Sequence, residues 1–242
     1  MKTYIVLPFK DRDGKYKNAL DEFINPFIEY LDKNIFDYEI LIVEQLGGSF
    51  KNSLPKIYEP ILGSIGVSHD EEFFNLGRTI NIGYDLLKDR ITDDDIFMFH
   101  PVDLMPADVD YSVDKTTKLC YREHSPDGRF YKSIAFKSSD FKEINGFSNN
   151  YWGWGLEDDD LFIRLECKNI DCGVKIDNYI RLSNDGNGKT DSEHYMPLYQ
   201  PNHAFLYEMR SSKDCSISGL NNLSYKLISI EKYNNINKYI IE

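Results

Sequence analysis

Short apolar runs alternate with amphipathic stretches along the first hundred residues of the chain. Residues 4–7, 39–43 and 96–99 are mainly apolar runs of a length typical of buried strands. Residues 18–33 and 73–88 instead carry apolar side chains every three or four positions, which is the spacing of one helix face. The alternation predicts an α/β fold in which helices connect the strands of a mostly parallel central sheet.

The first predicted helix contains a proline. Phe23, Phe27 and Leu31 lie four residues apart and mark its apolar face. Pro26 stands among them, and proline lacks the amide hydrogen that the interior of a helix needs. We expect a kink or a break at this position.

Length and composition favour a single soluble domain. A chain of 242 residues with 41% hydrophobic residues can bury one sizeable core, and it has no apolar run long enough to span a membrane. Met1-Lys2 leads directly into the first predicted strand, so we expect a cytoplasmic protein, unless an anchor has been removed. Four cysteines lack paired CxxC spacing and are expected to be reduced, namely Cys120, Cys167, Cys172 and Cys215.

The net charge of −12 at pH 7 argues against nucleic acid as a partner, because a protein that binds the phosphate backbone needs a basic face. A nucleotide ligand remains compatible with this charge if a metal ion supplies the positive charge.

The run from Trp152 to Asp160 places two tryptophans on glycine hinges directly before four carboxylates. Aromatic faces pack against sugar rings, and carboxylates accept hydrogen bonds or a proton from sugar hydroxyls. The glycines allow such a loop to close over a ligand. The carboxylates alone have a second explanation, because acidic residues favour the start of a helix and the apolar residues that follow predict a helix from about Glu157. The run is therefore a candidate sugar-binding catalytic loop.

Two further polar segments, residues 8–12 and 100–104, follow the first and third predicted strands. Ligands of a parallel sheet bind beyond the carboxyl ends of its strands. Lys10 and Arg12 there either face phosphates or lie in a solvated loop. Asp103 is a candidate ligand for a divalent metal on a diphosphate, and a turn or helix-cap aspartate is the ordinary alternative.

Taken together, these segments resemble the β-1,4-galactosyltransferase family over nearly the whole chain. The resemblance implies an inverting, metal-dependent glycosyltransferase with a Rossmann-like (GT-A) nucleotide-sugar fold. Residues 1–110 would form mainly the nucleotide-binding half of one domain, and residues 111–242 mainly the acceptor-binding and catalytic half. The segments that carry the resemblance are residues 8–12, 74–75, 81–83, 102–106, 144–160 and 219–225.

The resemblance also implies roles for single residues. Asp158 would be the general base, while Glu157, Asp159 and Trp152 would bind the saccharide acceptor. Asp103 would bind manganese or another divalent cation. A downstream histidine would complete the metal site, with His194 as the best match and His203 as the second candidate. The residues that would hold the UDP-sugar donor are Pro8, Phe9, Lys10, Arg12, Phe74, Arg78, Val102, Asp103 and Trp154, the last on a closing loop.

Several positions depart from the family pattern. Pro101 replaces the first aspartate of an Asp-Val-Asp triplet, and Leu76 stands where the family has an arginine. Arg78 either substitutes for that arginine or lies on the surface. The donor-sugar segment, usually an aromatic residue followed by two glycines, is here the sequence of residues 130–133. Leu156 replaces a hinge glycine, which we expect to stiffen the loop.

The residues and the resemblance lead to one functional hypothesis. Asp158 would take the proton of an acceptor hydroxyl as it attacks the anomeric carbon of a UDP-sugar, with a metal offsetting the charge of the departing diphosphate. Galactose or N-acetylgalactosamine is the expected donor sugar, and the product a β-linkage. The alternatives are a transferase of the same fold with another donor, such as UDP-glucose, and an inactive saccharide-binding module.

Overall fold

The computed structural model describes residues 1–11, 17–35, 37–46, 56–58, 73–122, 132–153, 155–182, 188–234 and 236–242. The side chains of residues 17–19, 121, 181 and 188–197 also lie outside the description.

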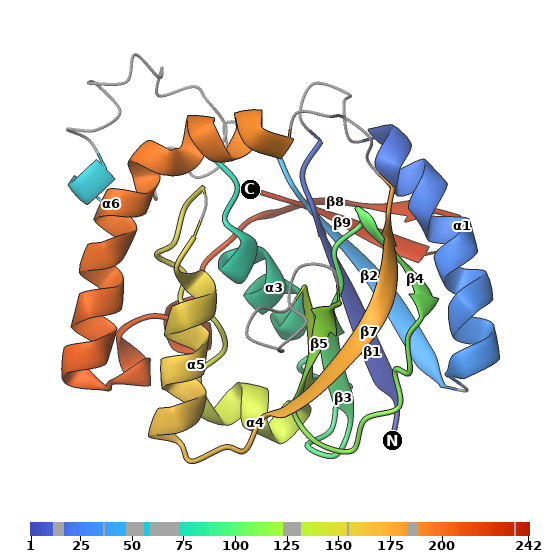
Figure 1. Ribbon diagram of the computed structural model, residues 1–242, viewed down its shortest axis with the longest axis horizontal. Helices are drawn as coiled ribbons and strands as arrows, with labels where there is room; N and C mark the ends of the chain where they lie inside the picture. The colour runs from blue at the N-terminus through green and yellow to red at the C-terminus, as the bar shows by residue number, and fades with distance from the viewer. Residues whose placement is uncertain are drawn as a thin grey trace.

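The described strands form one nine-stranded mixed sheet in the order β4-β7-β5-β6-β3-β1-β2-β9-β8 (Figure 1). The pairs β1–β2, β1–β3, β2–β9 and β5–β7 are parallel, whereas β3–β6, β5–β6, β4–β7 and β8–β9 are antiparallel. The strand bounds are Thr3–Phe9 (β1), Tyr38–Gln45 (β2), Ile96–Phe99 (β3), Leu104–Asp108 (β4), Thr117–Tyr121 (β5), Ser133–Lys137 (β6), Gly173–Arg181 (β7), Leu227–Tyr233 (β8) and Ile236–Ile241 (β9).

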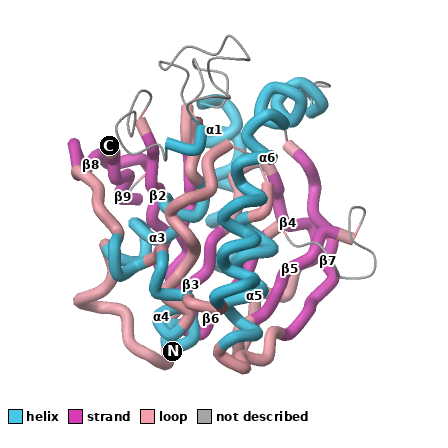
Figure 2. The backbone as a smooth tube through the Cα atoms, turned by 90° about the vertical axis from the view of Figure 1, so that its left-hand side faces the viewer, coloured by secondary structure: helices cyan, strands magenta, loops and turns pink. Residues whose placement is uncertain are grey.

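Helices cover both faces of the sheet (Figures 1 and 2). One face packs against α1, and the other against α3, α4 and α5, with α6 running beside α5. The helix bounds are Lys17–Asn34 (α1), Leu76–Asp85 (α3), Ser138–Glu143 (α4), Glu157–Cys167 (α5) and Gly188–Ser212 (α6), and the 3-10 turns are Lys56–Tyr58 (η2), Cys215–Ile217 (η3) and Leu220–Asn222 (η4).

The alternation of side chains along each strand divides the core in two. Tyr4 and Val6 of β1 belong to the cluster under α3, α4 and α5, whereas Ile5 and Leu7 belong to the cluster under α1. Helix α3 approaches β1 closely at Gly83, where an added Cβ would lie 2.6 Å from a methyl group of Val6. The apolar runs thus became strands buried on both faces.

The predicted elements are largely confirmed, with three corrections. The sheet is mixed rather than mostly parallel. The sequence did not show this, because the side-chain pattern of a strand buried on both faces is the same in either direction. Helix α1 continues through Pro26, so the expected break is wrong. Helix α3 begins at Leu76, three residues later than expected, because the side chain of Asn75 caps it by accepting a hydrogen bond from the amide of Arg78.

Among the described residues, no helix combines the length and the apolarity needed to cross a membrane. All four cysteines are free thiols, as the sequence predicts.

Candidate active site

The carboxyl ends of β1, β2 and β3 meet at one edge of the sheet because these strands are parallel. Phe9 and Lys10 at the end of β1 are each 5% exposed, and Pro8 pairs with Val43 of β2. Lys10 is therefore a buried side chain, and its alternative placement in a solvated loop is wrong. Arg12 lies outside the described residues.

The start of α3 is fixed to the same edge by Gln45, the last residue of β2. Its Nε2 donates to the carbonyl of Phe73 at 2.7 Å, and its Oε1 accepts from the amide of Asn75 at 3.0 Å. Phe74, between these two residues, is half-buried. The segment predicted to hold the donor therefore has a fixed backbone.

Arg78 is buried on α3, so its alternative placement on the surface is wrong. Its guanidinium donates to the carbonyl of Ser224, and burial lowers its pKa to about 10. The contact joins α3 to the C-terminal segment 219–225. Donor binding by Arg78 stays a prediction.

The turn between β3 and β4 carries Val102, which is buried, and Asp103, which is half-buried. The carbonyl of Asp103 accepts a hydrogen bond from the amide of Leu182 at 2.9 Å. This bond brings the end of β7 to the turn, and α6 begins six residues after Leu182 (Figure 1). His194 lies in α6, but its side chain is outside the description, and His203 is exposed nine residues further along the same helix.

His100 supports this turn from inside the core. It is fully buried among aromatic rings that include Phe27 and Tyr111. Its Nδ1 lies 2.8 Å from the carbonyl oxygen of Pro101, and its Nε2 lies 2.8 Å from the hydroxyl of Tyr111. Burial lowers the pKa of His100 to about 4, so the imidazole is neutral at pH 7 and fixes the backbone just before Asp103.

The segment before α5 turns sharply through three residues with positive φ, namely Gly153 at 75°, Gly155 at 96° and Leu156 at 76°. Helix α5 then begins at Glu157, as predicted, with its acidic residues in the first turn, where the helix dipole favours them. Burial and the neighbouring charge of Asp158 raise the pKa of Glu157 to about 8. Glu157 and Asp158 are half-buried and Asp159 is exposed.

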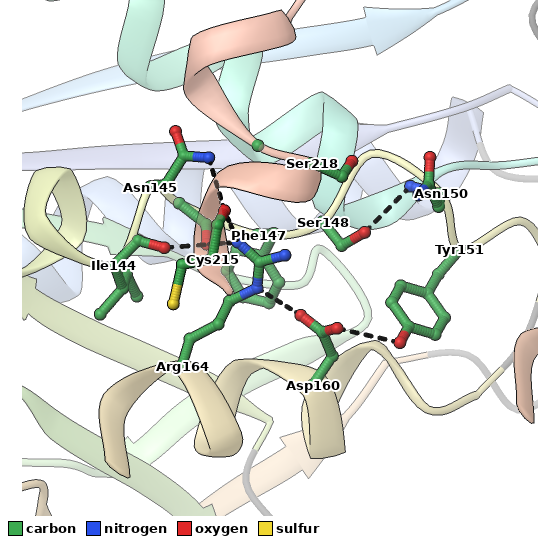
Figure 3. A network of polar contacts seen from close by, with 12 residues as sticks. Ile144, Asn145, Phe147, Ser148, Asn150, Tyr151, Asp160, Arg164, Cys215 and Ser218 are labelled. Atoms are coloured by element: carbon green, nitrogen blue, oxygen red, sulfur yellow. Dashed lines mark hydrogen bonds and ion pairs between the residues drawn. The ribbon is translucent and has the colours of Figure 1, made fainter. Parts of the chain in front are cut away.

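Asp160 differs from the other carboxylates because it is a buried structural residue (Figure 3). It forms an ion pair with Arg164, one helical turn later, and accepts a hydrogen bond from the hydroxyl of Tyr151 at 3.0 Å. Arg164 also donates to the carbonyls of Ile144 and Cys215, at 3.3 Å each. The network ties α5 to the segment that precedes the tryptophans.

Of the two tryptophans, only Trp152 lies in the described part of the chain. Trp152 is 2% exposed and belongs to the core cluster beside α5, so the expectation that it stacks on an acceptor sugar is wrong for this structure. Its proximity in sequence to the carboxylates gave no information on its burial. Trp154 lies outside the described residues.

One hydrogen bond joins the predicted donor segment to the predicted acceptor loop. The amide of Gly153 donates to the carbonyl of Phe74 at 3.0 Å. The start of α3 and the hinge before α5 therefore lie side by side, although 79 residues separate them in the sequence. A nucleotide at the start of α3 and an acceptor at the start of α5 would meet at this point.

The chain is similar in sequence and in fold to known proteins. A family model described as the N-terminal domain of galactosyltransferase matches residues 132–183. Human β-1,4-galactosyltransferase 4 is 27% identical over 248 residues, which are 95% of this chain and 60% of the relative. Mouse β-1,4-galactosyltransferase 1 is 26% identical over 252 residues, which are 96% of this chain and 52% of the relative.

The chain is similar to β-1,4-galactosyltransferases over nearly its whole length.

The chain spans 52–60% of the length of those two relatives. Its fold is the GT-A type found in a solved catalytic domain of Drosophila β-1,4-galactosyltransferase 7 bound to xylobiose. That structure matches with a TM-score of 0.65 and 19% identity over 100% of this chain and 93% of the other. A variant of the same Drosophila enzyme in complex with manganese, UDP-Gal and xylobiose matches with a TM-score of 0.62 and 20% identity, at the same coverage.

Sequence reasoning missed the buried polar side chains that hold the candidate site in place. Gln45 and His100 each stand at the end of a predicted strand, so their position at the functional edge was a usable signal. The sequence gives no such signal for Tyr58 and Asn202, because each contacts the tryptophan segment only through tertiary packing.

Proposed function

We propose that this protein transfers galactose or N-acetylgalactosamine from a UDP-sugar to a saccharide acceptor, with inversion to a β-linkage. The observation that carries the proposal is the hydrogen bond from Gly153 to Phe74. It brings the helix that begins with Glu157 and Asp158 to the segment that the family resemblance assigns to the nucleotide. The names of the curated relatives and the UDP-Gal and xylobiose of the Drosophila structure support this choice of donor and acceptor class.

The proposed chemistry needs a base and an oriented acceptor. Asp158 accepts the proton of the acceptor hydroxyl while the oxygen attacks the anomeric carbon, and the bond to the diphosphate breaks on the opposite face. Burial and the charge of Asp158 raise the pKa of Glu157, which favours its protonated form, and a protonated carboxyl can donate a hydrogen bond to an acceptor oxygen. Exposed Asp159 lies beside them and accepts from a further hydroxyl.

We propose that Asp103, at the edge of the sheet, and His194, in α6, hold a metal ion that is shared with the donor. No group of three His, Cys, Asp or Glu side chains comes together in the described parts of the chain, so Asp103 and His194 would need diphosphate oxygens to complete a coordination shell. Such a mixed oxygen and imidazole set suits manganese. The metal, when bound, supplies positive charge to the departing diphosphate.

We also propose that the protein acts in the cytoplasm, on the support of its four free cysteines, which suit a reducing compartment. The net charge of −12 supports partners other than nucleic acid.

The test is a donor panel with manganese. Each donor is supplied with and without a panel of saccharide acceptors, and UDP release is measured. The four donors are UDP-galactose, UDP-N-acetylgalactosamine, UDP-glucose and UDP-N-acetylglucosamine. We expect release with galactose or its N-acetylated form, only when an acceptor is present. Release with a glucose donor would identify a transferase of the same fold with another donor. Binding of a saccharide without release from any donor would identify an inactive binding module.

A further inference from the structure

Helix α6 holds the Trp-Gly-Trp-Gly segment through one side-chain amide. Asn202 is fully buried, and its Nδ2 donates to the carbonyl of Gly155 at 2.9 Å and to that of Trp152 at 3.4 Å. These carbonyls stand on either side of position 154. One side chain therefore fixes the backbone before and after that position.

Tyr58 orients this amide. Its hydroxyl donates to Oδ1 of Asn202 and accepts from the amide of Trp152 at 3.4 Å, so the NH2 group of Asn202 faces the loop. Burial raises the pKa of Tyr58 above its usual value, and the hydroxyl therefore keeps the proton that it donates. We refer to Tyr58 and Asn202 as the amide clamp.

Apolar contacts from the same face of α6 extend the clamp. Leu206, one turn after Asn202, packs with Leu156. On the other side, an added Cβ at Gly155 would lie 2.9 Å from the ring of Tyr199, so the backbone there rests directly on the helix. The first turn of α5 begins at Glu157, directly after these two residues that contact α6.

We propose that Asn202, oriented by Tyr58, is a positioning residue that sets the first turn of α5 and with it the reacting position of Asp158. This inference rests on the proposed function of Asp158 as general base, whereas the clamp geometry is independent of it. A displacement of a reacting group by about 1 Å can lower the rate on the order of a hundredfold. Asn202 of the clamp also lies on the helix that carries His194, so α6 contributes to both predicted halves of the site.

Two variants and one matched control test the proposal. Tyr58→Phe keeps the ring and removes the hydroxyl, and Asn202→Asp keeps the shape but places a carboxylate against two carbonyl oxygens. Gln200→Ala removes an exposed amide from the same helix. Trp152 and Trp154 are the two tryptophans of the chain, so tryptophan emission reports on the clamped segment without any substrate.

We expect both clamp variants to shift the emission and to lower kcat about tenfold or more, with the donor KM within about twofold of the parent. Gln200→Ala should match the parent in all three quantities. In the Asn202→Asp variant the new carboxyl donates only when it is protonated, so its emission should return towards that of the parent as the pH falls from about 8 to about 5.

Parent-like emission and kcat in Tyr58→Phe and Asn202→Asp would overturn the proposal. If Asn202→Asp does not fold, Tyr58→Phe decides by the same criteria. A parent protein that releases no UDP with any donor would disprove the proposed function instead, and unchanged emission in the variants would then still overturn the clamp.

Discussion

At the scale of single residues, Asp158 and Asp160 show how two carboxylates two positions apart come to lie in different surroundings. Two residues correspond to about 200° around a helix, so the two side chains point to opposite sides of α5. Asp160 is buried and neutralised by Arg164. Asp158 is half-buried on the side away from this ion pair.

Asp158→Asn should lower turnover by about a hundredfold or more, because the amide keeps the shape and loses the basicity. Donor binding should change little. Asp89→Asn, which removes the same charge from an exposed turn, is the matched control and should behave like the parent. Steady-state rates and donor affinity check this, and near-normal turnover of Asp158→Asn would move the base to Glu157.

Glu157 predicts a pH dependence of stability. Because the pKa of this carboxyl is raised from 4.5 to about 8 in the folded state, folding favours its protonated form. Its contribution is fully present below about pH 4.5 and is lost as the pH rises through about 8. The melting temperature of Glu157→Gln should match that of the parent near pH 4.5 and exceed it by a few degrees at pH 8. Parallel melting curves across this range would show that the shift is absent.

At the scale of elements, the start of α5 depends on a leucine in a left-handed conformation. Leu156 has φ of 76°, which disfavours a side chain by about 1–2 kcal/mol. It is 7% exposed and packs with Tyr151 and Leu206, and burial of a leucine contributes about 1.5–3 kcal/mol. Packing against α6 thus outweighs the backbone strain.

Leu156→Gly should therefore destabilise the protein by about 1–2 kcal/mol, since the loss of burial and the added chain entropy exceed the strain relieved. Leu156→Met keeps both the apolar volume and the strain, and should stay within about 1 kcal/mol of the parent. Urea unfolding measures both differences. A glycine variant as stable as the parent would mean that strain and burial cancel.

At the scale of the whole molecule, the proposed metal site would join two residues that are 91 positions apart in the sequence, Asp103 and His194. The hydrogen bond from the amide of Leu182 to the carbonyl of Asp103 supports this proposal, because it brings the end of β7 to the turn after β3, and α6 is the next helix along the chain.

Chelator should abolish activity and manganese restore it. Asp103→Ala and His194→Ala should each raise the manganese concentration for half-maximal rate about tenfold or more, because loss of even an outer partner of a metal ligand weakens binding by about 10- to 100-fold. Manganese titrations of the variants give this value. If His203→Ala raises it and His194→Ala does not, the ligand is His203.

The sequence by itself determined the strands β1, β2 and β3, the helices α1 and α3 that lie between them in the chain, and the start of α5 at Glu157. These features depend on local periodicity and on helix-terminal charges, which can be seen in a short window of sequence. The likeness of residues 144–160 to a family motif was also visible in the sequence alone, and the family model that matches residues 132–183 includes this segment.

Only the tertiary structure decided the direction of the later strands, the burial of Trp152 and Arg78, and the contacts made by Tyr58 and Asn202. Strands buried on both faces look alike in either direction, and an indole or a guanidinium can lie in a core or on a surface. The partner of a buried polar group comes from a distant part of the chain, so its position exists only once the sheet and α6 have packed together.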